Sequence, residues 1–244
     1  MSKNTDKLNH PLLLALETSG RLGSVALAEG DRLLDESSFT TPLRHSAEVF
    51  PAIAALLEKF NRKPEQIRHI YISIGPGSFT GLRIAATIAK SMHLANNNIK
   101  IVAVDTLDVI AANLEANRQY KNIATILDAK RNQFFVARYE ILHRTPNGGD
   151  TRYEKIGTDT LMTAKEFKDK FANTDAPIWL LGEGLVYYKD KFTADGIYFF
   201  DQKYWAPSAR KVHLLGRHLA RTNQFADPLT LTPTYLRNPV VKPK

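Results

Sequence analysis

The two halves of this chain repeat one order of predicted elements. Each half opens with two apolar strands joined by a turn, and an acidic residue, Glu17 or Asp128, follows the first of these strands. Each acid stands eight residues before a valine of the second strand, Val25 or Val136. Internal duplication of a strand-rich α/β unit predicts two similar lobes with a cleft between them.

Hydrophobic periodicity places the elements of both copies. For the first copy we expect strands at 12–16, 23–28, 33–39, 70–74 and 99–104, with helices over 46–60 and 78–94. For the second copy we expect strands at 123–127, 134–139, 153–158, 178–181 and 197–200, with helices over 163–171 and 207–222. The expected domains are a first lobe over 1–107 and a second over 108–205, with the segment of about 206–244 packing back on the first lobe.

The stretch from Ile70 to His93 combines a buried strand, a glycine turn and the start of a helix. The strand ends on Gly75-Pro76-Gly77, and Ser78 follows as a good helix N-cap. The spacing matches neither G-x-G-x-x-G nor a Walker loop, so neither common nucleotide motif is predicted. A helix N-terminus after such a turn can hold an anion near Arg83, but a structural turn with Arg83 in solvent explains the same residues equally well.

The helix after Ser78 has an apolar arc that covers more than half of its circumference, which predicts two neighbours. Gly81, Ala85 and Ala89, at i, i+4 and i+8, form a seam of small residues on it that another helix could approach closely. The helix over 46–60, in which Pro51 either starts the main helix or kinks it, is expected to lie alongside. Either a partner covers this surface, or the seam faces the sheet of its own lobe.

The composition limits which classes of protein this chain can belong to. The chain has no cysteine, so it has neither a disulfide framework nor a thiolate metal site. Its 33 Lys and Arg against 25 Asp and Glu give a net charge of +8, which fits a nucleic-acid partner or plain solubility. The apolar runs are too short to span a bilayer and the first residues do not resemble a leader, so we expect a cytoplasmic protein.

Six motifs, in this order, resemble those of the TsaB (YeaZ) family, a bacterial subunit of the machinery that makes threonylcarbamoyladenosine in transfer RNA. The longest and most specific is Gly75-Pro76-Gly77-Ser78-Phe79-Thr80-Gly81-Leu82-Arg83. The others lie at 14–19, 44–48, 127–130, 182–184 and 233–237. The resemblance implies an α/β, actin-like and Hsp70-like ATPase fold of the ribonuclease H-like type, duplicated in two lobes.

The resemblance also implies the position of a nucleotide site. Glu17-Thr18 and Asp128-Ala129 would occupy the two phosphate hairpins, and Gly182 and Gly184 the adenosine turn. Active phosphotransferases of this superfamily usually carry Asp-x-Gly at both hairpins so that backbone amides wrap the phosphates, and this chain lacks those glycines. We therefore expect no catalytic residue and, at most, weak binding of ATP or ADP.

The catalytic paralogue of the family, TsaD, resembles a metalloenzyme with a His-x-x-x-His pair on its first helix, where two imidazoles can share a metal ion. In this chain His45 is followed four residues later by Val49, and no other two histidines have that spacing. We expect no resident metal, and His45 is expected to be a helix-start or interface residue.

The function implied by the resemblance is that of a non-catalytic subunit. It would pair with TsaD and support transfer of threonylcarbamoyl from threonylcarbamoyl-AMP to an adenosine next to the anticodon. The implied partners are a TsaD-like subunit, a TsaE-like ATPase, tRNA within the complex, and a second copy of the chain when TsaD is absent. The expected partner surface comprises His45, Val49, Phe50, Ile53, Gly81, Ala85, Ala89 and Met92. The alternative is an actin-like kinase or ATPase that turns over ATP.

Overall fold

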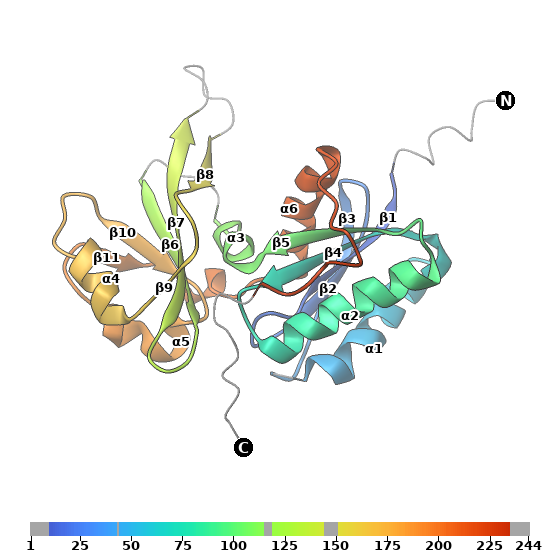
Figure 1. The fold of residues 1–244 in the computed structure, drawn as a ribbon, viewed down its shortest axis with the longest axis horizontal. Helices are drawn as coiled ribbons and strands as arrows, with labels where there is room; N and C mark the ends of the chain where they lie inside the picture. The colour runs from blue at the N-terminus through green and yellow to red at the C-terminus, as the bar shows by residue number, and fades with distance from the viewer. Residues whose placement is uncertain (1–9, 43, 115–118, 144–150, 235–244) are drawn as a thin grey trace.

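Two lobes lie side by side in the computed structural model, which describes residues 10–42, 44–114, 119–143 and 151–234 (Figure 1). Within these residues the first lobe holds a five-stranded sheet in the order β3-β2-β1-β4-β5. The second lobe holds a six-stranded sheet in the order β11-β10-β6-β7-β8, and β9 pairs with β7 outside this path.

In the first lobe three strands are followed by a helix, a strand, a second helix and a last strand. The strands are β1 (Leu12–Glu17), β2 (Ser24–Glu29), β3 (Arg32–Ser38), β4 (Ile67–Gly75) and β5 (Lys100–Asp105), and the helices are α1 (His45–Lys59) and α2 (Phe79–Ala95), with a short 3₁₀ helix at Pro64–Gln66. β2 pairs antiparallel with β1 and β3, whereas β4 lies parallel between β1 and β5. Every residue of β1 is buried, as expected for a strand covered on both faces.

The second lobe repeats this arrangement. Its strands are β6 (Asn122–Asp128), β7 (Phe134–His143), β8 (Thr151–Lys155), β9 (Thr160–Met162), β10 (Ile178–Leu181) and β11 (Ile197–Phe199), and its helices are α4 (Ala164–Phe171) and α5 (Leu185–Tyr188), with 3₁₀ helices at Lys189–Phe192 and Gln202–Tyr204. β7 is antiparallel to β6 and β8, and β10 is parallel to β6 and β11. Apart from the added β9, both sheets thus have the order third-second-first-fourth-fifth, which confirms the duplication and the actin-like α/β fold.

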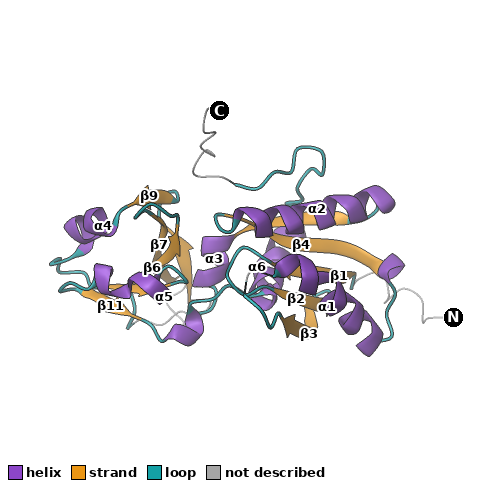
Figure 2. Ribbon diagram, turned by 90° about the horizontal axis from the view of Figure 1, so that it is seen from below, coloured by secondary structure: helices purple, strands orange, loops and turns teal. Residues whose placement is uncertain are grey.

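The last helix, α6 (Ala209–Arg221), returns to the first lobe. Ala209 and Val212 pack in one cluster with Leu13, Ala15 and other residues of the first sheet. α1 and α2 cover the opposite face of that sheet, and Figures 1 and 2 show the sheet between these two helices and α6. The described part of the C-terminal segment therefore packs on the first lobe.

A short helix and an ion cluster connect the two lobes. α3 (Thr106–Ala111) follows β5, and Asp105 at its N-cap accepts a hydrogen bond from the amide of Leu107 at 2.7 Å. Lys155 of β8 places its Nζ 2.7 Å from Asp108 Oδ1, 2.8 Å from Asp159 Oδ1 and 3.5 Å from Asp105 Oδ2. Burial, assisted by the neighbouring carboxyl groups, raises the pKa of Asp105 to about 8. One lysine thus joins acids from both lobes.

Each strand and helix expected from the sequence is present, with ends that differ by a few residues. Ser78 caps α2, since its hydroxyl oxygen accepts a hydrogen bond from the amide of Gly81, and Pro51 lies inside α1. The sequence analysis did not predict α3, β9 or α5. The two helices have six and four residues, which is too short to show a helical period.

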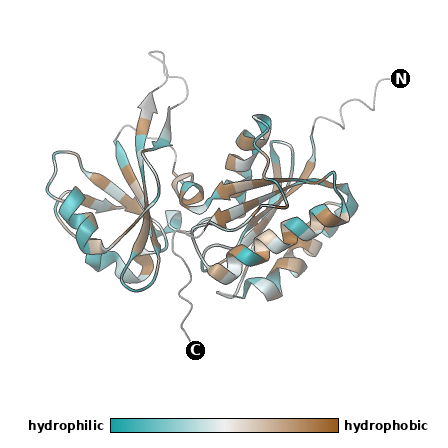
Figure 3. Cartoon of the chain, in the orientation of Figure 1, coloured by the Kyte–Doolittle hydropathy of each residue, from teal (hydrophilic) through white to brown (hydrophobic). Residues whose placement is uncertain are grey.

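The hydrophobic residues concentrate in the strands of both sheets, whereas α4 is largely hydrophilic (Figure 3). Aromatic side chains are prominent in the core of the second lobe, where Phe134 and Phe167 both contact Phe192. Of the helices in the described ranges, none combines the length and apolar content that crossing a bilayer requires.

Candidate functional site

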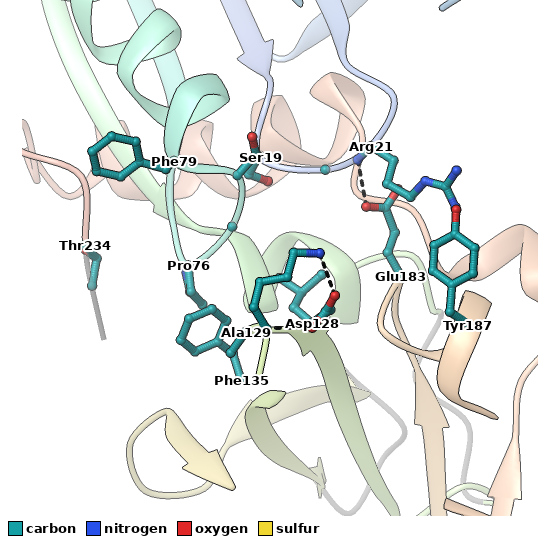
Figure 4. A pocket seen from close by; sticks show the side chains of 15 residues that line it. Ser19, Arg21, Pro76, Phe79, Asp128, Ala129, Phe135, Glu183, Tyr187 and Thr234 are labelled. Atoms are coloured by element: carbon teal, nitrogen blue, oxygen red, sulfur yellow. Dashed lines mark hydrogen bonds and ion pairs between the residues drawn. The ribbon is translucent and has the colours of Figure 1, made fainter. Parts of the chain in front are cut away.

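A cleft of about 460 Å³ lies between the lobes, where the turns after β1, β4, β6 and β10 come together (Figure 4). Its lining comprises Ser19, Gly20, Arg21, Pro76, Gly77, Ser78, Phe79, Leu127, Asp128, Ala129, Lys130, Phe135, Glu183, Tyr187 and Thr234. The duplicated plan explains this position, since the two copies place their hairpins and glycine turns at facing edges of the two sheets.

The first hairpin acid, Glu17, is buried beneath the cleft. One of its carboxylate oxygens accepts hydrogen bonds from the hydroxyl and the backbone amide of Ser19, the amide at 2.6 Å, and the other accepts one from the hydroxyl of Ser73 on β4. Burial raises the pKa of Glu17, and the hydrogen bonds from Ser19 and Ser73 partly oppose this rise. Glu17 is fully buried and does not line the cleft, so it is not placed to contact a ligand. Its role is structural, because it connects the first hairpin to β4.

The glycine turn before α2 supports the first hairpin. The hydroxyl of Thr18 donates a hydrogen bond to the carbonyl of Gly81 at 2.7 Å, and the amide of Ser78 donates to the carbonyl of Ser19 at 2.8 Å. A Cβ at Gly77 would lie 2.7 Å from that same carbonyl oxygen, so glycine permits the close approach. These contacts favour the interpretation of a structural turn over that of an anion site.

Gly75 and Arg83 lie on either side of this turn, at the end of β4 and within α2. Gly75 has a φ of +119°, a backbone conformation that favours glycine. Arg83 lies one turn into α2, and its guanidinium stacks on Phe79 with its Cζ 3.9 Å from the ring centroid.

The second hairpin acid, Asp128, lines the cleft. Its Oδ1 accepts a hydrogen bond from the backbone amide of Lys130, and its Oδ2 from the Lys130 ammonium, each at 2.7 Å. This contact raises the pKa of Lys130. The amide of Ala129 donates to the carbonyl of Gln133 at 2.9 Å, which closes a turn in which Lys130, Arg131 and Asn132 all have positive φ.

Gly182 and Gly184 lie beneath the cleft and do not line it. Gly182 has a φ of +125°, and a Cβ there would lie 2.3 Å from the carbonyl oxygen of Ile126 on β6. The amide of Gly184 donates a hydrogen bond to that same oxygen at 3.0 Å. Of the five residues expected to bind nucleotide, only Asp128 therefore lines the cleft, because Glu17, Thr18, Gly182 and Gly184 are used for packing between strands and turns.

Glu183, between these glycines, reaches across the cleft to the first lobe. Its Oε2 accepts a hydrogen bond from the amide of Arg21 at 2.8 Å. Burial raises its pKa to about 7, while the amide of Arg21 acts in the opposite direction. The sequence analysis missed Arg21, Lys130, Glu183 and Tyr187 as residues that line the cleft. In the sequence, only the Gly182-Glu183-Gly184 motif indicated this part of the cleft. The prediction assigned the adenosine turn to its two glycines and gave no role to Glu183.

The hairpins already use the amides that could bind phosphate. The amides of Ser19 and Arg21 donate to Glu17 and Glu183, and the amide of Lys130 donates to Asp128. A phosphate that entered the cleft would have to displace a carboxylate from each of these donors. In the described part of the chain, no three His, Cys, Asp or Glu side chains are grouped so that they could hold a metal ion. That the protein binds no metal stays a prediction.

The seam of small residues on α2 faces the interior of its own lobe. A Cβ at Gly81 would lie 1.7 Å from the carbonyl oxygen of Thr18, and Ala85 and Ala89 are fully buried against the first sheet and α1. The prediction that Gly81, Ala85 and Ala89 form a partner surface is therefore wrong, because the helix is rotated so that its smallest residues meet the closest neighbours.

Two further residues of the predicted partner surface are also buried. Val49 lies in the core, and His45 begins α1 with its Nε2 3.1 Å from the carbonyl oxygen of Gly20. Burial lowers the pKa of His45, which favours the neutral ring. His45 therefore ties the helix to the first hairpin, as a helix-start residue does, and is not exposed to a partner.

An apolar groove between α1 and α2, here called the α1–α2 groove, remains open to solvent. Its lining comprises Ser46, Val49, Phe50, Phe79, Thr80, Arg83, Ile84, Thr87 and Ile88. Phe50 is 61% exposed and Phe79 is 44% exposed. Ile53 and Met92 are partly buried. Of the eight residues expected to contact a partner, Phe50, Ile53 and Met92 thus remain accessible.

Comparisons with known proteins agree with this architecture. The family model described as TsaD, tRNA N6-adenosine threonylcarbamoyltransferase, matches residues 40–177, which is more than half of the chain. The TsaB protein of Bacillus subtilis, described as a tRNA threonylcarbamoyladenosine biosynthesis protein, is 28% identical over 92% of this chain and 93% of its own length. TsaB of Haemophilus influenzae is 25% identical over 93% of this chain and 94% of its own length.

A solved structure shows the same fold. YeaZ from Pseudomonas aeruginosa superposes with a TM-score of 0.74 at 22% identity, and the match covers 92% of this chain and 99% of that one. The duplicated sheets, the two hairpins at the cleft and these similarities along nearly the whole chain show that the chain belongs to the TsaD family and, within it, to the TsaB (YeaZ) group.

Proposed function

We propose that this chain is a non-catalytic subunit required for formation of threonylcarbamoyladenosine in tRNA. It would pair with a TsaD-like subunit that transfers threonylcarbamoyl from threonylcarbamoyl-AMP to an adenosine next to the anticodon. The observation that carries this proposal is the exposed α1–α2 groove on a lobe whose cleft hairpins already donate their amides to the chain's own acids. The names of the curated relatives support the same pathway.

The α1–α2 groove has the chemistry of a protein interface. Phe50 presents a large aromatic surface to solvent, and Arg83 stacks on Phe79 at the rim. Exposed aromatic and arginine side chains dominate the binding free energy at many interfaces. A matching helix pair of a TsaD-like subunit fits this groove, and a second copy of the chain would cover it when that subunit is absent. Contacts with a TsaE-like ATPase and with tRNA complete the proposed complex.

Substitutions in the groove test the partner surface. Phe50→Asp places a charge at an exposed apolar position, so we expect its affinity for the TsaD-like subunit to fall at least tenfold, by about 1.4 kcal/mol or more, at an unchanged melting temperature. Leu94→Asp is the matched control, because Leu94 is 82% exposed at the C-terminal end of α2 and does not line the groove. Calorimetric titration and thermal unfolding measure both quantities. Intact association in Phe50→Asp and in Ile84→Asp would place the partner surface elsewhere.

The alternative of an actin-like kinase or ATPase predicts tight nucleotide binding and turnover. Because hairpin amides already serve Glu17, Glu183 and Asp128, we expect adenine nucleotide to bind in roughly the high micromolar range or more weakly, which corresponds to about 4 to 6 kcal/mol. Calorimetry and a phosphate-release assay of the purified chain, with and without magnesium, check this expectation. Nanomolar binding with rapid hydrolysis would support the alternative.

A further inference from the structure

The carboxylate of Glu183 makes a contact that an anionic ligand could make. It extends from the turn after β10 in the second lobe and accepts a hydrogen bond from the amide of Arg21 in the first hairpin (Figure 4). The two residues are 162 positions apart in the sequence. Backbone amides at turns bind carboxylate and phosphate oxygens alike, so this amide is a donor for either group.

The backbone fixes this contact from both sides of the cleft. At Gly20 a Cβ would lie 2.9 Å from Glu183 Oε2, so glycine leaves the space that the carboxylate occupies. On the other side, Gly182 and Gly184 pack closely on Ile126 and hold the turn that carries Glu183. The position of the carboxylate is therefore built into the fold.

A cation stands beside the same contact. The guanidinium of Arg21 lies over the ring of Tyr187 on α5, with its Cζ 4.7 Å from the ring centroid. A carboxylate of the second lobe thus meets an amide of the first, while a guanidinium of the first lobe stacks on an aromatic ring of the second. The amide and the guanidinium of one residue together offer a hydrogen-bond donor and a positive charge at the cleft.

We propose that the amide and guanidinium of Arg21 form a site for a phosphate-bearing ligand, and that the chain's own Glu183 fills this site and keeps such a ligand out. A phosphate that enters must displace the carboxylate and is repelled by its charge. The neighbouring amides of Ser19 and Lys130 offer no ready alternative, because they donate to Glu17 and Asp128. At the point where a ligand phosphate would bind, the carboxylate of Glu183 already occupies the cleft.

Binding of inorganic pyrophosphate at pH 8, measured by calorimetry on the full chain, tests this proposal. Glu183→Ala removes the carboxylate, so we expect pyrophosphate to bind at least tenfold more tightly than to the unchanged protein. Glu183→Gln keeps an acceptor oxygen but loses the charge, so we expect an intermediate gain of at least threefold. Glu154→Ala is the control for charge alone, since Glu154 is exposed on β8 and does not line the cleft. It should leave pyrophosphate binding unchanged.

A double variant identifies the site. Arg21→Ala combined with Glu183→Ala should lose the gain, because it removes the guanidinium. Equal binding by the unchanged protein and both Glu183 variants would overturn the proposal, and so would a gain that survives Arg21→Ala. If Glu183→Ala does not fold, Glu183→Gln alone decides, because its side chain has the same size and keeps the contact with the Arg21 amide. The α1–α2 groove takes no part in this experiment, so a negative result would leave the proposed partner surface untouched.

Discussion

Glu17 and Asp128 hold the same place in the two copies of the repeat, but their surroundings differ. Glu17 is completely buried and accepts hydrogen bonds from Ser19 and Ser73. Asp128 lies at the cleft and binds Lys130 of its own turn. The duplication has kept the backbone plan, whereas the acid became part of the core in the first lobe and part of a cleft-lining turn in the second.

The helices that cover the two sheets also differ between the copies. α2 spans 17 residues and buries one side against its sheet, whereas α5, at the same point of the second copy, spans 4 residues. α1 leaves Phe50 exposed, whereas α4 turns an ion pair of Lys165 and Asp169 to solvent, with Nζ and Oδ2 2.6 Å apart. Of these two helices, α1 thus exposes an apolar side chain, whereas α4 presents charge.

The largest expected effect concerns the buried side of α2. Ala85→Arg places a charged side chain where the exposed fraction is 0%, so we expect the free energy of unfolding to fall by about 4 kcal/mol or more, enough to prevent folding. Thr87→Arg, on the exposed side of the same helix, should leave stability nearly unchanged. Urea unfolding followed by circular dichroism compares the two. A folded Ala85→Arg protein would contradict the orientation of α2.

The two hairpin acids should differ clearly in their effect on stability. Glu17→Ala leaves the buried hydroxyls of Ser19 and Ser73 without an acceptor and opens a cavity, so we expect it to lower the free energy of unfolding by about 3 kcal/mol. Asp128→Ala removes a contact within one turn and should cost less than about 1 kcal/mol. Equal losses in urea unfolding would show that the acids have equivalent roles after all.

The contact between the lobes should depend on pH through Glu183. Its pKa is raised from 4.5 to about 7 in the folded protein, so the folded state binds the proton more tightly than the unfolded state. The stability that Glu183 contributes is fully present below about pH 4.5 and is lost as the pH rises through about 7. Arg21, Asp128 and Lys130 line the cleft with Glu183, and Glu17 lies buried beneath it.

Glu183→Gln isolates this dependence. Between pH 5 and 8.5 we expect the stability of the unchanged protein, relative to Glu183→Gln, to fall by roughly 2 kcal/mol. This is somewhat less than a rise in pKa from 4.5 to about 7 would give for a fully buried group. Urea unfolding at several pH values measures the difference, in which other titrating groups cancel. A difference that stays constant with pH would contradict the raised pKa of Glu183.

The smallest effect is expected on the outer face of α4. Lys165→Ala breaks a fully exposed ion pair one turn apart, and solvent screens such pairs, so neither the melting temperature nor association with the TsaD-like subunit should change measurably. Loss of association in this variant would show that the second lobe also contributes a partner surface.

Sequence patterns predicted the order of elements along the chain, its repeat in the two halves and the cap at Ser78. Each strand, helix and cap was recognisable because it depends on residues close together in the chain. They did not predict the direction of the seam at Ala85, since periodicity defines an apolar arc but not which part of it meets the sheet. They also missed Glu183 and Arg21, because only the folded turns bring residues 162 positions apart to one hydrogen bond.

The return of α6 to the first lobe sets an order for folding during synthesis. Leu13, Ala15 and Ala26 face α6, so one face of the first sheet lacks its helix until the residues after 208 have left the ribosome. The second lobe, which lies between the two parts of the first in the sequence, is complete by then. The lobe that begins the chain is therefore the last to finish folding, and until then its uncovered sheet is a surface that chaperones would bind.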